Sequence, residues 1–362
     1  MGEGTPFSLD IHGFVSPGWV WSTHNNYLAK STDGSFEFSE VGINFTKQLT
    51  DDLRFGVQLF ARDLGPIGNY SPKFDWYYLD YHWRDWLAFR AGRIKIPFGL
   101  YNESADIDAA RVPILLPSAM YPTTARDYLL AQTGFELYGR LRLGGAGAFE
   151  YRGYCGTIFV EPTPAPGAAL QVTSTENPYV AGGRFFWETP LEGLRVGGTI
   201  QSLRLDTTFA FAATPTSVRV KVPVLLWVTS AEYVKDNLQL ALEYGEWKLD
   251  FESTNPALFP TFTIVSQRGY FLAAYRLTSW LSVSTYYSLW YPSKEQRSGR
   301  QSYQGDLAGT FRFDINQYWL VKLEAHWMHG TAGLDSSLND NIPLSKLAQD
   351  WAFVAVKTTL YF

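Results

Sequence analysis

The sequence predicts an all-β fold: a transmembrane, antiparallel, up-and-down β-barrel of about 16 strands with short periplasmic turns and long extracellular loops. Three observations predict it. Almost every segment of the 362-residue chain alternates apolar and polar residues with the period of a strand. The connectors between these segments alternate between tight turns and long loops. The closing stretch, "WAFVAVKTTLYF", alternates strictly and ends on an aromatic residue, so we expect it to be tied into a sheet.

The alternating segments follow one another along the whole chain, and we expect residues 1–362 to form a single barrel domain. Helical signals are weak, and the only plausible helical turns lie inside 104–131 and 342–348. In chain order, the expected strands are 7–22, 35–49, 52–64, 73–84, 86–98, 132–144, 147–161, 178–189, 193–206, 222–234, 237–251, 266–278, 280–291, 303–316, 318–330 and 348–362.

The connectors fall into two classes of length. The short ones carry the Asp, Asn, Gly, Pro or Ser residues that suit hairpin turns: 49–52, 84–85, 144–147, 189–193, 234–237, 277–279 and 315–318. The long ones lie between them: 23–34, 65–72, 99–131, 162–177, 207–221, 252–265, 292–302 and 331–347. One end of the sheet therefore carries only turns and the other only long loops, which is typical of bacterial outer-membrane barrels and not of a soluble sandwich.

The two faces of the expected strands agree with this reading. Between residues 53 and 62, apolar side chains alternate with Arg54, Gln58 and Arg62, and residues 319–327 alternate around Lys322 and Glu324. Aromatic residues gather near the strand ends. This pattern predicts apolar residues against lipid, polar residues toward a lumen, and aromatic girdles at both interfaces. The last strand must then pair with the first, so that no edge is left open in the bilayer.

Composition excludes several other classes of protein. Charged residues are 18% and aromatic residues 17% of the chain, and the net charge of −5 gives no basic patch for nucleic acid. With Cys155 as the single cysteine, neither an internal disulfide nor a multi-thiolate metal site can form. We expect no cofactor and no bound metal. The predicted location is the bacterial outer membrane.

A family resemblance lies in the string "LAFRAGRIKIPFGLYNES" and the following "RVPILLPSAMYP". These stretches resemble the porins of the phosphate-selective O/P superfamily and their uncharacterised proteobacterial relatives, most specifically from Gly92 to Gly99. The similarity extends to about residue 125, after which only the barrel pattern and the terminal Phe362 remain. The resemblance implies a sixteen-stranded diffusion channel for ions and small solutes, often trimeric. Substrate does not carry over, because the arginine ladder and lysine cluster of phosphate-selective channels are not found.

The connector 99–131 is the main candidate for a functional element, because it is far longer than a typical connection. It follows the fifth expected strand, where porins of this size usually fold a loop back into the barrel. We expect it to form a constriction. An ordinary exposed loop with solvated charges is the alternative. Its candidate site residues are Glu103, Asp106, Asp108, Arg111 and Arg126.

Basic residues on the early strands are the second candidate feature. Arg93 and Lys95 have the opposite parity to Arg90, and we therefore expect a bulge at Gly92, with Ile94 and Ile96 facing lipid. A basic wall facing an acidic loop would create a transverse field that sets ion selectivity. The alternative is a set of lumenal ion pairs that only fill the barrel. The predicted pore-lining basic residues are Arg54, Arg62, Arg90, Arg93 and Lys95.

Catalysis has little support, and we expect no enzyme activity. His326 and His329 should point to opposite faces of one strand, and no catalytic motif is present. The predicted function is a passive diffusion channel for small hydrophilic solutes, with anionic solutes favoured by the resemblance. The expected partners are these solutes, outer-membrane lipid and lipopolysaccharide, and further copies in a trimer. The alternative is a non-conducting or enzymatic barrel: a surface-binding protein, lipase or protease. An enzyme would need a Ser/His or Asp/His set at the rim, which the sequence does not reveal.

Overall fold

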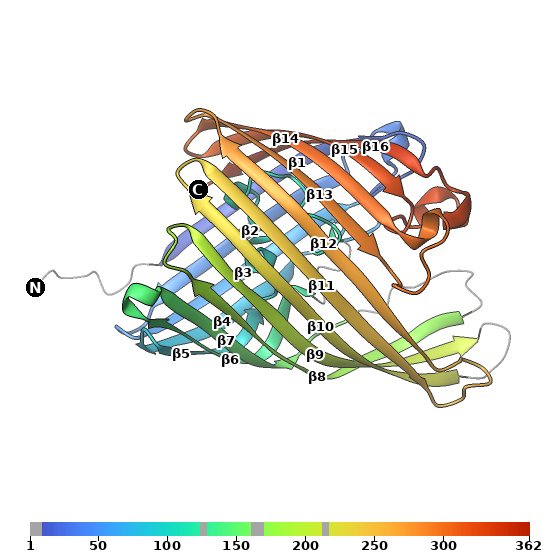
Figure 1. Ribbon diagram of the computed structural model, residues 1–362, viewed down its shortest axis with the longest axis horizontal. Coiled ribbons are helices and arrows are strands. Elements are labelled where there is room, and N and C mark those ends of the chain that lie inside the picture. The colour runs from blue at the N-terminus through green and yellow to red at the C-terminus, as the bar shows by residue number, and fades with distance from the viewer. Residues whose placement is uncertain (1–8, 124–128, 161–169, 212–216) are drawn as a thin grey trace, which may run out of the picture.

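The computed structural model describes residues 9–123, 129–160, 170–211 and 217–362. These residues form sixteen antiparallel strands, each paired with its neighbours in sequence, and β1 pairs with β16 to close the barrel (Figure 1). The first eight are β1 (Asp10–Ser22), β2 (Phe38–Gln48), β3 (Leu53–Leu64), β4 (Lys73–Arg84), β5 (Leu87–Lys95), β6 (Ala131–Arg142), β7 (Ala148–Thr157) and β8 (Leu170–Glu188). The others are β9 (Leu194–Phe211), β10 (Ser217–Lys235), β11 (Leu238–Ser253), β12 (Phe262–Arg276), β13 (Leu281–Tyr291), β14 (Gln304–Asn316), β15 (Trp319–Gly330) and β16 (Asp350–Tyr361).

The two ends of the barrel differ in the length of their connectors, as predicted. The tight turns, such as 49–52 and 85–86, lie at the end that also holds the C-terminus (Figure 1). The long connectors lie at the opposite end. Closure follows the register in which Val20 pairs with Ala355 and Gly18 with Lys357. The predicted barrel, its strand number and its closure by the last strand are confirmed.

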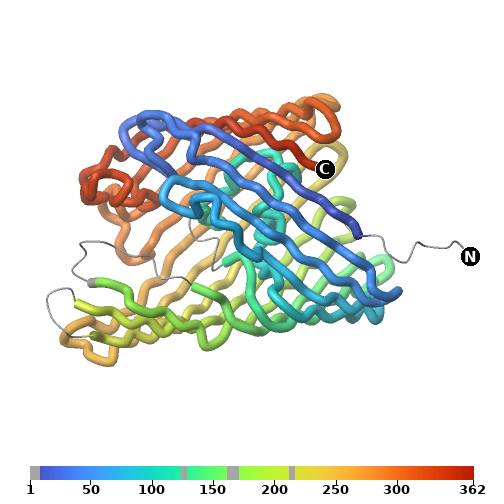
Figure 2. The backbone as a smooth tube through the Cα atoms, turned by 180° about the vertical axis from the view of Figure 1, so that it is seen from behind, coloured from blue at the N-terminus to red at the C-terminus, as the bar shows by residue number. Residues whose placement is uncertain are grey.

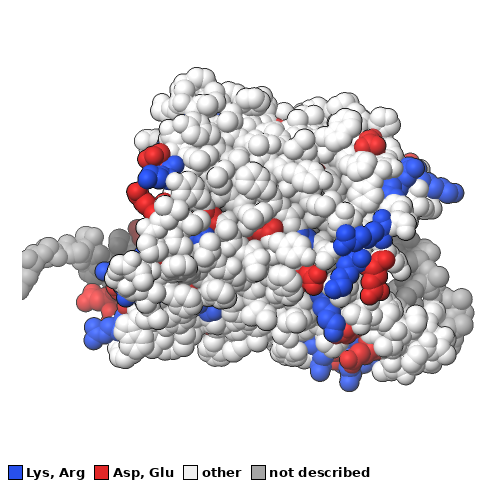
Figure 3. All heavy atoms as spheres, in the orientation of Figure 1, with Lys and Arg blue, Asp and Glu red and all other residues white. Residues whose placement is uncertain are grey.

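The outer face of the wall is apolar and the inner face largely polar. Phe135, Phe185 and Ile200 point outward with 67%, 52% and 56% of their surface exposed, whereas the inward Gln58 and Lys357 are 3% and 2% exposed. Figure 3 shows one side of the barrel, where charged groups gather toward the two ends and are sparse in the middle. Such a band suits the hydrocarbon layer of a membrane. Among the described residues, no helix is long and apolar enough to cross a bilayer.

Strands β8 to β10 and β12 are longer than the sequence analysis expects. Much of the expected connectors 162–177 and 207–221 is strand, although 161–169 and 212–216 lie outside the described residues. The cause is visible in β10, where Val218 and Val220 face inward and are 2% and 0% exposed, while Arg219 and Lys221 face outward. Here the polar side faces out, so these strands continue beyond the apolar band.

The core lies inside the barrel rather than between two layers. Residues 96–123, which follow β5, enter the lumen and lie between opposite walls (Figure 2). We call residues 96–123 the inner segment. Its Phe98, Leu116 and Met120 pack in one apolar cluster with Val224 and Trp247 of the β10–β11 wall, and the rings of Phe98 and Trp247 are 6.0 Å apart. This apolar packing places the polar side chains of the inner segment against the other walls.

Candidate functional site

The inner segment is first anchored to β3 and to the end of β5. Asp106 accepts hydrogen bonds from Lys95 Nζ at 2.5 Å and from Gln58 Nε2 at 2.6 Å. Lys95 is the last residue of β5, where the chain leaves the wall and turns inward, and its Nζ also donates to the Glu103 carbonyl. Asp106 is 1% exposed. This pair joins a predicted wall residue to a predicted loop residue by direct contact.

Asp108 forms the second anchor, against β15 and β16. Lys322 Nζ of β15 lies 3.0 Å from Asp108 Oδ1, and Thr359 Oγ1 of β16 donates to Asp108 Oδ2 at 2.8 Å. Burial would raise the pKa of the Asp108 carboxyl, but the charges of Lys322, Lys357 and Arg111 hold that pKa well below its usual range. Asp108 is therefore an ionised anchor at neutral pH.

Glu103 forms a third anchor with two arginines that the sequence analysis does not identify. Arg152 Nη1 of β7 lies 2.5 Å from Glu103 Oε1, and Arg184 Nη1 of β8 lies 2.8 Å from Oε2. Burial raises the pKa of the Glu103 carboxyl, and the two guanidinium groups lower it below its usual value. Lumenal parity alone could have shown Arg152 and Arg184 as inward residues, but not their partner.

The rest of the inner segment is tied to the wall by hydrogen bonds to two further carboxylates. Glu324 of β15 accepts the backbone N–H groups of Ile114 and Leu115 at 2.7 and 2.8 Å. Glu243 of β11 accepts from the Tyr121 hydroxyl and from the Leu100 backbone N–H. With the three anchors described above, the inner segment contacts walls on several sides of the lumen.

Three of the predicted basic wall residues lie on the inner face. Arg54 Nη2 is 2.9 Å from Asp80 Oδ2, and Arg90 bridges Asp80 and Glu136 at 3.2 Å each. Arg62 Nη1 donates to the Thr123 carbonyl of the inner segment at 3.0 Å. Arg90 lines one cavity together with Glu103 and Asp108 of the inner segment.

Arg93 corrects the sequence analysis. The pairing of β5 with β4 and β6 shows no register shift at Gly92, so the expected bulge is not there. Arg93 pairs with Tyr77 and Thr133, which places it on the outer face, because paired residues share one face of a sheet. Its Nε donates to the Asp75 carbonyl at 2.9 Å.

The irregularity lies one strand away. Gln58 pairs with Trp76 and Leu59 with Phe74, which leaves Asp75 of β4 as the extra residue of a bulge.

Ile94 and Ile96, expected to face lipid, are instead 2% and 0% exposed, and Ile94 lines a lumenal cavity. Ile94 faces inward because it alternates with the outward Arg93, and Lys95 and Ile96 reach the lumen side where the chain leaves the wall at the end of β5.

Arg111 and Arg126 complete the predicted loop residues. Arg111 donates to backbone carbonyls of its own segment, those of Ala105, Pro113 and Ile114, the last at 2.9 Å. It therefore braces the fold of the inner segment. Arg126 lies outside the described residues.

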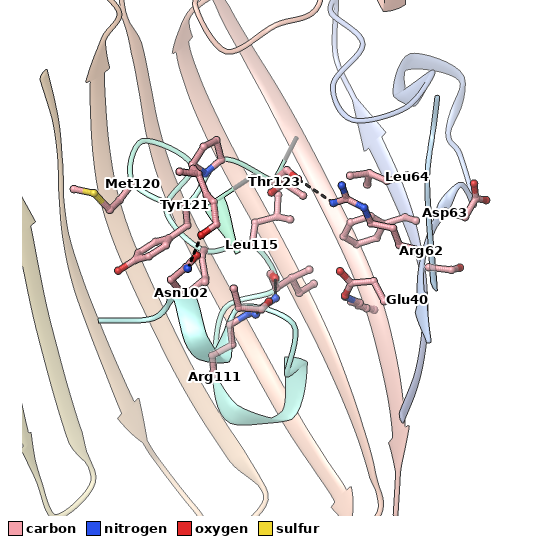
Figure 4. A pocket seen from close by; sticks show the side chains of 18 of the residues that line it. Glu40, Arg62, Asp63, Leu64, Asn102, Arg111, Leu115, Met120, Tyr121 and Thr123 are labelled. Carbon is pink, nitrogen blue, oxygen red and sulfur yellow. Dashed lines mark hydrogen bonds and ion pairs between the residues drawn. The ribbon is translucent and has the colours of Figure 1, made fainter. Parts of the chain in front are cut away.

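Two cavities lie on either side of the inner segment. The extracellular cavity, of about 70 Å³, is lined by Arg62, Arg111 and Lys357 together with Glu40 and Asp63. Figure 4 shows Arg62 and Glu40 on the wall side and Arg111, Leu115 and Tyr121 on the side of the inner segment. Three cations and two carboxylates leave this lining with one excess positive charge.

The periplasmic cavity, of about 480 Å³, lies below the first along the same strip of wall. Its lining includes Asn44, Gln58 and Thr359, and these residues follow Glu40, Arg62 and Lys357 of the extracellular cavity along β2, β3 and β16. Between the two cavities, Lys357 Nζ and Glu40 Oε2 are 2.5 Å apart, and Asp108 lies 4.0 Å from Lys357. Charged groups therefore line the strip where the two cavities approach each other.

An Asp/His pair lies at the extracellular rim, on the outer face. His329 Nδ1 is 2.6 Å from Asp350 Oδ1, and its Nε2 is 2.9 Å from the Tyr303 hydroxyl. The two residues are 21 positions apart in the sequence, and only the β15–β16 register brings them together. Its third partner is a tyrosine rather than a serine, so the set does not match the usual hydrolase arrangement.

His326 faces inward, as expected from its spacing, and contacts Asp306 and Glu324. Among the described residues, no three His, Cys, Asp or Glu side chains group as a metal site.

Comparisons with known proteins show the fold. Neither a protein-family model nor a curated protein matches the sequence. Among solved structures, OmpT, an outer membrane protein of Vibrio cholerae, is similar at 11% identity and a TM-score of 0.63, over 98% of this chain and 97% of that one. An anion-selective porin from Comamonas acidovorans is similar at 13% identity and a TM-score of 0.62, over 98% and 99%. The outer membrane channel DcaP of Acinetobacter baumannii is similar at 9% identity and a TM-score of 0.57, over 98% and 97%.

These likenesses and the closed, apolar-faced barrel have a common consequence. The chain has the porin-like fold of an outer-membrane barrel, and the bacterial outer membrane is its location. The specific resemblance to the phosphate-selective superfamily stays an expectation from the sequence.

Proposed function

We propose that this protein is a passive diffusion channel for small hydrophilic solutes, anions in particular, with no chemical turnover. The observation that carries the proposal is the alignment of the two cavities along one strip of wall formed by β16 and β1 to β3. A path along this strip would pass the Lys357–Glu40 pair and Arg62, where the inner segment narrows the lumen. The excess positive charge of the extracellular cavity favours anions at the entrance.

A non-conducting barrel is the second candidate. The contacts of the inner segment with β3, β7, β8, β11, β15 and β16 favour it, because a segment held on so many sides leaves little open lumen. In that case the barrel would present its extracellular loops as a binding surface. An enzymatic barrel is less favoured, because the His329–Asp350 pair lacks a serine partner.

A planar-bilayer experiment separates these candidates. Asn44 lines the periplasmic cavity, and its neighbour Phe45 belongs to the outer face of β2. With Cys155 first replaced by Ala, Asn44→Cys should give a current that a small, charged methanethiosulfonate reagent reduces, and Phe45→Cys should give one that the reagent leaves unchanged. Reversal potentials in a salt gradient should show anion preference. A folded protein without current would favour the plugged barrel, and equal block of both variants would contradict the proposed path.

We propose further that copies associate as a trimer, and that the outer face meets lipid and lipopolysaccharide. One similar structure, of Vibrio cholerae OmpT, is described as a trimer form. The outward Arg93 supports association, because a guanidinium on a lipid-facing wall is better accommodated under a neighbouring protein surface. Crosslinking of the folded protein in membranes would detect the trimer.

A further inference from the structure

Aromatic side chains follow the proposed permeation strip from one cavity to the other. Phe38 of β2 lines the extracellular cavity, and Trp76 and Tyr78 of β4 line the periplasmic cavity. Between these levels, the rings of Phe14 on β1 and Phe60 on β3 lie 6.3 Å apart. We call these five residues the aromatic lane. The four strands that carry them, β1 to β4, are adjacent in the barrel, so the five side chains lie on one part of the wall.

A glycine makes room for the middle of this lane. Gly42 of β2 lies between Glu40 and Asn44, at the level where the strip passes from one cavity to the other. A Cβ at Gly42 would lie 2.5 Å from Cε1 of Phe14, closer than side-chain carbons approach. The inward Phe14 ring therefore depends on the absence of a side chain at this position.

A cation stands against the lane at each end. Lys357 Nζ lies 5.2 Å from the centre of the Phe38 ring, and the Arg90 guanidinium lies 5.2 Å from the centre of Tyr78. The Trp76 and Tyr78 rings stack with centres 5.2 Å apart and planes at 24°. An aromatic surface beside a fixed positive charge suits a ligand that has a flat apolar body and one negative group.

The end of the aromatic lane at the periplasmic cavity also carries a hydrogen-bond donor without an acceptor. The indole Nε1 of Trp76 is buried and has no hydrogen-bond acceptor among the described residues. A buried donor without a partner is destabilising, so it marks a place where an acceptor from a ligand would be favourable. A carboxylate oxygen is such an acceptor.

We propose that the aromatic lane selects small aromatic carboxylates over inorganic anions and over neutral solutes, an inference that rests on the proposed channel function. The carboxylate is drawn to Arg62 and Lys357 at the extracellular cavity. The ring then moves along the lane and stacks near Trp76 and Tyr78. Inorganic phosphate has no surface to stack, and a neutral sugar gains nothing from the cations at the two ends.

The test uses the full-length protein in planar bilayers, with chloride as the carrier of current and benzoate as the probe. Benzoate should reduce the chloride current at a concentration about threefold to tenfold below that of acetate, which has the same charge and no ring. Trp76→Ala should raise the concentration of benzoate needed for half-block by a similar factor, about threefold to tenfold, and leave that of acetate unchanged. Trp83→Ala, on the outer face of the same strand and 48% exposed, is the matched control and should change neither.

The outcomes are distinguishable. If benzoate and acetate block the chloride current at equal concentrations, the inference is overturned and the proposed channel stands. The same holds if benzoate blocks Trp76→Ala at the same concentration as the wild type. If glucose blocks the chloride current at lower concentrations than benzoate, the lane binds neutral sugars in preference to aromatic carboxylates, and the inference is also overturned. Absence of any chloride current contradicts the channel itself. Calorimetric titration of the folded protein with benzoate then decides the inference. A heat of binding that is present in the wild type and absent in Trp76→Ala supports the ring site. Absence of a heat of binding in the wild type overturns it.

Discussion

Asp108 ties the inner segment to β15 and β16 through side chains that are removed from water. The Asp108 and Lys322 side chains are both 0% exposed, and Thr359 occupies the second carboxylate oxygen. Removing one member of such a buried pair leaves the other charge uncompensated and costs about 3–5 kcal/mol, whereas replacing both with apolar residues of similar size is often neutral. The pair is therefore a sharp probe of whether the inner segment is held in place.

We predict that Asp108→Asn destabilises the folded protein by about 3–5 kcal/mol, because Lys322 remains buried without its carboxylate. Urea unfolding in detergent micelles measures the loss. The double variant Asp108→Leu with Lys322→Met should recover most of it. The pKa of Asp108 is lowered in the folded state, so its stabilisation is fully present above the unfolded pKa of about 4 and is lost as pH falls through the folded value. Stability of the wild type should fall more steeply than that of Asp108→Asn in this acidic range, and parallel curves would contradict the assignment.

At the scale of single residues, alternation predicts the face but not the partner. Parity correctly places Arg54, Arg62 and Arg90 on the inner face. It cannot show that Asp108 meets Lys322, because that contact depends on the path of the inner segment through the lumen. The prediction that Arg93 faces the pore is wrong. It depends on a bulge at Gly92, and without that bulge the alternation of β5 places Arg93 on the outer face.

At the scale of strands, β10 changes character along its length. In its periplasmic half, Leu225 and Trp227 face outward, and Ser230 and Glu232 face inward, as expected in lipid. In its extracellular half, charged residues face out and valines face in. Strand ends predicted from outward-facing apolar residues therefore fall too early in β10. The same inversion of the two faces explains why β8 and β9 extend beyond their expected bounds.

We predict that Val220→Asp opens the extracellular ends of β9 to β11, because Val220 is 0% exposed and an unpaired carboxylate there would be buried. Limited digestion with proteinase K should cut this variant within residues 205–255 and leave the rest of the barrel intact. Lys221→Gln changes the neighbouring, outward residue without adding a negative charge beside Asp206 and Glu252, and it should resist digestion like the wild type. Equal resistance of both variants would show that the inner face of this extension is not a packed surface.

At the scale of the whole molecule, the number and closure of the strands could be predicted from local rules. Tight turns alternate with long loops, and an apolar terminal strand needs partners on both sides, so only a closed ring satisfies the chain. The interior could be predicted only in part. The length and position of 99–131 indicate an inward loop, but its route depends on residues far apart in sequence, such as Glu103 with Arg152 and Tyr121 with Glu243.

Closure has a direct test in the last strand, which hydrogen-bonds to β15 along one side and to β1 along the other. Deleting residues 348–362 would expose two strand edges to lipid, where each unsatisfied backbone group costs several kcal/mol. We predict that this truncation yields no heat-modifiable, folded band on gels after expression in an outer membrane. Deleting residues 335–341 from the preceding extracellular loop leaves every strand pair in place and should still give the folded band. A folded truncation beside the folded control would mean that fifteen strands can close without β16, and the outer-membrane barrel would then have to be stable with a different pairing of β1 and β15.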